Sequence, residues 1–101
     1  MMRRSRMEVF TDIMKVVAAG KIKRTHIMYR ANLAWTVLRD ALQVLEDRGI
    51  LRTESQGHEI YVSLTEQGFK TLRQFFEIEN TFSFVGEDLS RKLSAPALLL
   101  G

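Results

Sequence analysis

Apolar residues in the first part of the chain recur every three or four positions, the spacing of one face of an α-helix. Residues 5–19 show this pattern, and Gly20 follows where a helix is expected to stop. The apolar positions of this segment are Met7, Phe10, Ile13, Met14 and Val17. The pattern predicts a first helix that packs on a core.

Residues 25–49 predict two further helices joined by a very short turn. Thr25 is the candidate N-cap of the first, and Ile27 and Met28 are its inward apolar residues. The apolar face of the second is formed by Leu38, Ala41, Leu42 and Leu45. A turn this short does not allow two helices to lie antiparallel, so the segment predicts a helix-turn-helix.

The turn itself is expected at residues 30–33. Asn32 tolerates a left-handed backbone, and Leu33 is expected to fill the angle between the two helices. Gly49 is predicted to end the second helix in a left-handed conformation.

After Gly49 the period changes from helical to two residues, which predicts strands at 50–55 and 59–64 around a turn at Gln56, Gly57 and His58. Thr65 then caps a fourth helix. Gly68 inside this helix is less favourable than Ala by about 1 kcal/mol, which indicates close approach to a strand.

The C-terminal part of the fourth helix has alternating three- and four-residue apolar steps, which form the seam of a coiled coil. Gly86 interrupts this seam and Lys92 occupies its next position. The seam predicts a homodimer, and the alternative is that the helix folds back onto its own core. The candidate interface residues are Phe75, Ile78, Phe82, Val85 and Leu89.

Three helices, two strands and a further helix follow the order of a winged helix-turn-helix, in which the hairpin is the wing. The runs THIMYRANLAW at 25–35, DRGIL at 47–51 and LTEQG at 64–68 resemble the archaeal winged-helix DNA-binding family over about residues 3–85. The family usually has Ser where this chain has Ala34, so the side-chain cap of the recognition helix is missing and Asn32 is expected to replace it in part.

The resemblance implies a mainly helical α+β fold, with three helices and a two-stranded wing at 1–65, a dimerisation helix at 66–93 and a flexible tail at 94–101. Some members of this family pair through an antiparallel coiled coil, which gives a dimer with two DNA-binding heads.

The charge is unevenly distributed along the chain. Residues 1–30 hold eight of the 15 Lys and Arg residues but only Glu8 and Asp12 of the 12 acids, so the remainder holds seven cations and ten acids. A cationic front half suits a polyanion such as DNA, whereas charges can also serve only to keep a small domain soluble.

A chain of 101 residues supports one core, and the absence of cysteine excludes disulfides and thiolate zinc sites. The apolar runs are much shorter than the roughly 20 residues that a membrane span requires. We therefore expect a soluble cytoplasmic protein associated with the nucleoid.

A recognition helix enters the major groove by its N-terminal turns, whose exposed side chains reach base edges. The candidates for base reading are Trp35, Thr36, Arg39, Asp40 and Gln43. The candidates for contact with the DNA backbone are Lys21, Lys23, Arg24, Thr25, Arg30, Arg52, Gln56, Gly57 and His58. Arg3, Arg4 and Arg6 are either an arm for DNA or an unstructured start. Glu54 and Glu59 are expected to repel phosphate from the wing.

No pattern in the sequence suggests catalysis. His26 and His58 lack the spaced partners of a metal site, and no nucleophile elbow or phosphate loop occurs. We expect neither an enzyme nor a cofactor, metal or small-molecule substrate. The expected function is a transcription regulator that binds double-stranded DNA as a dimer. The alternatives are a sequence-independent nucleoid protein, a module for protein–protein interaction and, less favoured, an RNA-binding protein.

Overall fold

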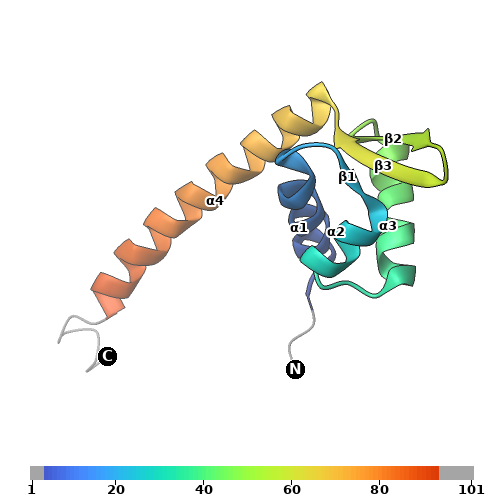
Figure 1. Ribbon diagram of the computed structural model, residues 1–101. Coiled ribbons are helices and arrows are strands. Elements are labelled where there is room, and N and C mark those ends of the chain that lie inside the picture. Colours follow the sequence, from blue (N-terminus) through green and yellow to red (C-terminus); the bar gives the residue numbers. More distant parts are fainter. Residues whose placement is uncertain (1–3, 94–101) are drawn as a thin grey trace.

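The computed structural model describes residues 4–93, which form four helices and one antiparallel sheet (Figure 1). The elements are α1 (Arg6–Ala18), β1 (Ile22–Lys23), α2 (Arg24–Arg30), α3 (Trp35–Asp47), β2 (Leu51–Gln56), β3 (Glu59–Leu64) and α4 (Glu66–Leu93). The first three helices and the sheet form a head from which α4 projects as a rod (Figure 1). The predicted mainly helical winged-helix fold is confirmed. Arg3 and the predicted tail at 94–101 lie outside the described residues.

The core joins the first three helices to the sheet. Its largest fully buried side chains are Ile13 and Val17 of α1, Ile27 of α2, Leu38 of α3 and Val62 of β3. Burial of each such side chain stabilises the fold by about 1.5–3 kcal/mol. The predicted apolar face of α3 is buried at all four positions.

Met7 is the exception to the predicted core face of α1, because it is exposed. It lies in the first turn of α1 and lines a shallow apolar cleft with Phe75, Ile78 and Phe82 of α4. Met7 therefore borders the cleft beside the rod and is not part of the core.

The first helix is capped as a capping box. The Ser5 hydroxyl accepts a hydrogen bond from the Glu8 amide, and the Glu8 carboxylate accepts one from the Ser5 amide, both at 3.1 Å. These hydrogen bonds from Ser5, the backbone one first, lower the pKa of Glu8.

The predicted cap of α2 at Thr25 is wrong, because α2 begins at Arg24 and its N-cap is Lys23. The two residues before α2 form a short strand for which the sequence showed no pattern: Ile22 pairs with Val62 and Lys23 with Tyr61. This pairing keeps the backbone extended up to Lys23, so the helix starts one residue before Thr25. The sheet therefore has three strands in the order β1-β3-β2, one more than the predicted wing.

The two helices of the helix-turn-helix end in the same backbone reversal. At the end of α2, Asn32 has φ 52° and the Leu33 amide donates to the Met28 carbonyl at 3.1 Å. At the end of α3, Gly49 has φ 74° and the Ile50 amide donates to the Leu45 carbonyl at 2.9 Å. Both are Schellman motifs, and both predicted left-handed positions are confirmed.

Thr65 caps α4 as predicted and also attaches it to the end of α3. Its hydroxyl accepts from the Gly68 amide at 3.0 Å, and its own amide donates to the Ile50 carbonyl at 3.1 Å. A Cβ atom at Gly68 would lie 2.2 Å from that same Ile50 oxygen, so the predicted close approach is confirmed. Helix α4 continues through Gly86 without a break.

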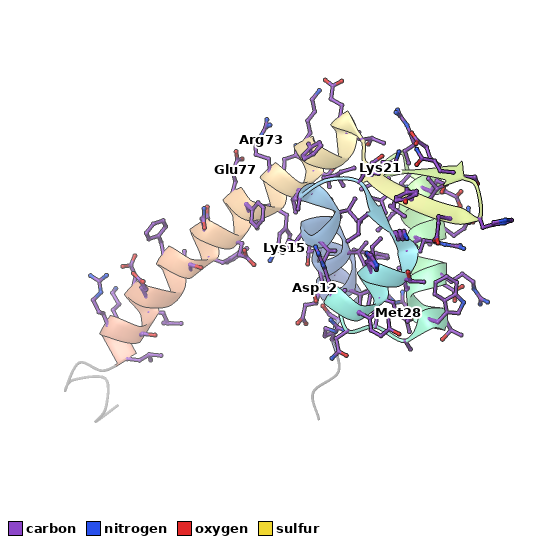
Figure 2. All side chains as sticks on the ribbon, viewed as in Figure 1. Asp12, Lys15, Lys21, Met28, Arg73 and Glu77 are labelled. Carbon is purple, nitrogen blue, oxygen red and sulfur yellow. The ribbon has the colours of Figure 1, made fainter. Side chains whose placement is uncertain are left out.

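Lys15 joins α1 to α4. Its ammonium group lies 3.9 Å from the Glu79 carboxylate and 5.7 and 5.4 Å from the ring centres of Phe75 and Phe76 (Figure 2). Figure 2 shows Arg73 on the side of α4 that faces away from the head. Figure 1 shows the C-terminal part of α4 extending away from the head, and the apolar side chains of this part, Phe82, Phe84, Val85, Leu89 and Leu93, are exposed.

We predict that Gly68→Ala destabilises the protein by about 1–3 kcal/mol or more, because the new methyl group overlaps the Ile50 carbonyl, which is backbone and cannot turn aside. The measurement is urea unfolding followed by circular dichroism.

Gly86→Ala is the matched control, since Gly86 lies in the same helix and a methyl group added there would point into open space, as far as residues 4–93 are concerned. This change should leave stability equal or raise it by about 0.5–1 kcal/mol. Equal stability of Gly68→Ala and the wild type would contradict the close contact.

Candidate nucleic-acid interface

Helix α3 presents an exposed face because its opposite face is committed to the core. Leu38, Ala41, Leu42 and Leu45 are buried, so the residues between them point outward. The predicted base readers Thr36, Arg39, Asp40 and Gln43 all lie on the exposed side.

The start of α3 carries no side-chain cap. Its N-cap is Ala34, and no side chain of the described residues accepts a hydrogen bond from the first turn. The expected replacement by Asn32 is therefore wrong. Asn32 occupies the left-handed position that ends α2, and from that position it does not cap α3.

Trp35 lies under a cation from the neighbouring helix. The guanidinium carbon of Arg24 is 5.1 Å from the Trp35 ring centre, a cation–π contact. Trp35 as a residue is 38% exposed, so it is neither core nor a free stacking surface. This contact joins the first residue of α2 to the first residue of α3.

Two of the predicted base readers are engaged with acidic neighbours on α3. The Arg39 Nε atom lies 3.3 Å from the Asp40 carboxylate, and the Gln43 amide donates to the Asp47 carboxylate at 2.9 Å. Exposed pairs of this kind contribute only about 0.2–1 kcal/mol. Either side chain can therefore exchange its acidic neighbour for a ligand at small cost.

The exposed side of α3 faces the wing across a cleft of about 220 Å³. The Thr53 hydroxyl donates to the Glu46 carboxylate at 2.8 Å and connects β2 to α3. The cleft is lined by Arg24, Arg39, Leu42, Gln43, Glu46, Thr53 and Ile60.

A smaller cleft of about 150 Å³ connects the wing tip to the start of α2. It is lined by Arg24, Thr25, His58, Glu59 and Ile60. Arg24 and Ile60 border both clefts, so the structure brings Arg24, Thr25, Arg39, Gln43 and His58 to one side of the head.

Three other predicted backbone contacts lie on the opposite side of the sheet. Lys21, Lys23 and Arg30 line a cleft of about 260 Å³ together with Tyr61. Neighbouring strand residues point to opposite faces, so Tyr61 and Ile60 lie on different sides of β3. The candidate backbone contacts are therefore divided between two surfaces.

Both lysines on that side are paired with acids of the wing. The Lys21 ammonium group donates to the Glu54 carboxylate at 2.9 Å and lies 5.2 Å from the Tyr61 ring centre. The Lys23 ammonium group lies 3.6 Å from the Glu59 carboxylate. The register of the sheet brings these charges together. Lys23 of β1 and Glu54 of β2 both lie opposite Tyr61 of β3, so the lysines before α2 and the acids of the wing lie on the same face. The acids expected to repel DNA here neutralise lysines of the same chain.

The hydrogen bond from Lys21 lowers the pKa of Glu54, and the positive charges of Lys21 and of Arg52 lower it further. Because the pKa is lowered on folding, this pair stabilises the fold at neutral pH, and its contribution disappears as the pH falls through the folded-state pKa.

Tyr29 is a surface residue that the sequence pattern did not identify as a candidate. It lies on α2 one turn after Thr25 and is 76% exposed. Its position four residues after Thr25 was the only available signal, since residues four apart share one helical face.

Two negative findings apply to residues 4–93. No helix in that range is long and apolar enough to cross a membrane. Within the same range, His, Asp and Glu side chains do not gather in any group of three that could hold a metal ion.

Comparisons with known proteins agree with this geometry. A sequence profile described as winged helix-turn-helix matches residues 3–83. An uncharacterised protein of Methanocaldococcus jannaschii is 29% identical over 79 residues, which are 78% of this chain and 80% of that protein.

Two solved structures from Sulfolobus solfataricus have a similar fold. The DNA-binding protein Sso10a-2 matches with a TM-score of 0.68 and 23% identity, over 91% of this chain and 99% of that one. The transcriptional regulator BldR matches with a TM-score of 0.70 and 21% identity, over 92% of this chain and 68% of that one. The fold thus resembles those of DNA-binding proteins and transcriptional regulators.

We predict that Lys21→Met raises the pKa of Glu54 toward its ordinary value, because the hydrogen bond and the positive charge of Lys21 are both removed. The measurement is a titration of the glutamate side-chain carboxyl signals by NMR. Lys23→Met is the matched control, since Lys23 pairs with Glu59, and should leave the titration of Glu54 nearly unchanged. An unchanged Glu54 titration in Lys21→Met would show that the pair does not form in solution.

Proposed function

We propose that this chain, which belongs to the winged helix-turn-helix family, is a transcription regulator that binds double-stranded DNA with α3 in the major groove. The observation that carries the proposal is the shared surface of α3, the start of α2 and the wing tip. It brings Arg24, Thr25, Arg39, Gln43 and His58 to one side of the head.

Arg39 and Gln43 are the proposed base readers. They stand four residues apart on the exposed face of α3, so both side chains project toward the same few base pairs. A guanidinium group can bind guanine with two hydrogen bonds, and a glutamine amide can do the same with adenine. Thr36, in the first turn, has a methyl group for thymine and a hydroxyl group for phosphate.

The proposed grip on the DNA backbone comes from Arg24, Thr25 and the wing tip at Gln56, Gly57 and His58. Arg24, Thr25 and His58 line the small cleft between the wing tip and the start of α2, and Arg24 also lies over Trp35 at the start of α3, where the phosphates that flank a recognition helix are expected. Arg30 and Arg52 form no ion pair within the described residues and are available to phosphate. Lys21 and Lys23 should add less, because each must first leave its carboxylate.

We further propose that two chains pair through α4. Phe82, Val85 and Leu89 are all more than half exposed, and they share one helical face with Phe75 and Ile78. An isolated rod would leave this seam in water, whereas a second copy of the helix would cover it. Met7 of α1 lies at the edge of the same seam and should be covered with it.

The acidic residues of α3 favour one alternative function. Asp40, Glu46 and Asp47 outnumber Arg39 on the exposed surface of this helix, a balance that suits a basic protein partner better than a polyanion. This observation supports a protein-interaction module as the second candidate. A sequence-independent nucleoid protein would be favoured over a regulator if the chain bound all DNA duplexes without sequence preference. Because the family is typified by DNA-binding regulators, we propose no catalytic activity.

We predict that Arg39→Ala weakens binding to a preferred duplex by about 1–3 kcal/mol and to random duplex much less, because only base contacts are lost. The preferred duplex is first selected from a random pool, and affinities are measured by fluorescence anisotropy at several salt concentrations.

Arg48→Ala is the matched control, since Arg48 is the exposed C-cap of the same helix, remote from its first turns. It should bind preferred and random duplexes like the wild type. Equal losses on both duplexes for Arg39→Ala would favour the nucleoid protein, and no loss on either would favour the protein-interaction module.

We predict that Phe82→Glu converts a dimer to a monomer, because a carboxylate would be buried in the seam. Phe84→Glu is the matched control: Phe84 and Phe82 are each 68% exposed, but Phe84 points away from the seam. Sedimentation equilibrium at tens of micromolar should give a dimeric mass for the wild type and for Phe84→Glu. A monomeric wild type, or a dimeric Phe82→Glu, would contradict pairing through this face.

A further inference from the structure

The corner between α2 and α3 leaves two carbonyl groups that the helices do not satisfy. The reversal at Asn32 uses the carbonyls of Met28 and Tyr29, whereas those of Ala31 and Asn32 lie beyond the last hydrogen-bonded turn of α2. Helix α3 begins soon afterwards at Trp35, and its N-cap Ala34 gives it no side-chain cap. The position of the recognition helix therefore depends on what holds this corner.

Arg4 holds both carbonyl groups from a distant part of the chain. Its Nη1 atom donates to the Ala31 carbonyl at 2.5 Å, and its Nη2 atom donates to the Asn32 carbonyl. Nη1 also donates to the Asp12 carboxylate of α1 at 3.1 Å. The planar guanidinium group thus spans adjacent carbonyl groups with two donors, which a lysine cannot reproduce.

We infer that Arg4 is a positioning residue for DNA recognition, which rests on the DNA-binding function proposed above. Asp12 orients the guanidinium group from α1, and the guanidinium group fixes the corner at which α3 begins. Figure 2 shows Asp12 on α1, one turn before Lys15. Through these contacts, α1 serves as the anchor for the angle between α2 and α3.

The partial burial of the contact separates this role from that of a DNA arm. The side chain of Arg4 is 31% exposed and that of Asp12 is 36% exposed. An arm that binds phosphate needs a free guanidinium group, whereas Arg4 already serves three acceptors. Arg6 offers the comparison: it is exposed in the first turn of α1, and no hydrogen bond or ion pair within residues 4–93 engages its side chain.

The two roles predict different effects of salt. Loss of a phosphate contact reduces the slope of log affinity against log salt concentration by about 0.9. Loss of a positioning residue reduces the fraction of molecules with the recognition helix in place and lowers affinity by that fraction, with the number of phosphate contacts unchanged. We expect Arg4→Ala to bind the preferred duplex about tenfold more weakly with an unchanged slope. Arg4→Lys keeps the charge but should remain weakened.

Asp12→Asn is a second variant that keeps the arginine in place. It makes the protein more positive, so charge alone predicts tighter binding to DNA. Loss of the orienting carboxylate predicts weaker binding instead. Weaker binding of Asp12→Asn therefore supports the positioning role, and tighter binding overturns it.

The corner is tested without DNA by hydrogen exchange. The amides of Asn32 and Leu33 donate the two hydrogen bonds of the reversal and should exchange faster in Arg4→Ala than in the wild type. In Arg6→Ala, the matched control, they should exchange as in the wild type. Unchanged exchange in Arg4→Ala, or a salt slope reduced by about 0.9, would overturn the inference. If Arg4→Ala exchanges faster but the wild-type protein binds no DNA, the role of Arg4 at the corner is supported and only the proposed DNA-binding function is rejected.

Discussion

The architecture of this chain depends on how two helices end. A helix leaves its last carbonyl groups without partners, and burial of the helix requires that partners be found nearby. The reversals at Asn32 and Gly49 solve this problem with the same pair of backbone hydrogen bonds. The first reversal sets the angle at which α3 leaves α2. The second delivers the Ile50 carbonyl to Thr65, which starts α4, and leaves only enough room for glycine at position 68. The recognition surface and the rod are thus both placed by helix C-termini.

The sequence predicted the elements that have a clear period and lacked information on those that do not. The apolar face of α3 and the hairpin were recoverable because several turns or alternations repeat the same pattern. Strand β1 has two residues, too few to show a period, and its existence depends on pairing with β3 far along the chain. Contacts between residues distant in the sequence could not be predicted for the same reason. Lys21 and Glu54 are 33 residues apart, so the sequence showed their charges but not their pairing. The sequence showed Arg4 as one of several basic residues at the start of the chain, and its contacts with the turn between α2 and α3 could not be predicted from it.

Charge in the head is organised by the sheet. On the outer face of the sheet, Lys21 and Lys23 are each paired with a carboxylate of the wing, so these two lysines add little net charge to this face. The other side retains Arg24 over Trp35 and Arg39 beside Asp40, contacts that water weakens and a polyanion can replace. The uneven distribution of charge along the sequence therefore overstates the positive charge of the folded surface. Arg30 and Arg52 form no ion pair within the described residues, and Arg24 lies at the start of α2 over the first residue of α3, where a cation can affect the orientation of the proposed DNA ligand as well as its affinity.

Helix α4 is attached to the head along its first half, so a small change of angle at the head moves its free end by a larger distance. The ion pair between α1 and α4 is at Glu79, and the helix continues to Leu93. At a rise of about 1.5 Å per residue, Leu93 lies about 21 Å beyond Glu79, so a tilt of roughly 10° at the Lys15 contact displaces it by about 4 Å. A substitution at Phe76 would act on this contact without changing a seam residue, whereas Lys15 also lies over the ring of Phe75 in the seam. In the proposed dimer, the distance between two heads joined at their rods would therefore depend on the contact of Lys15 with α4.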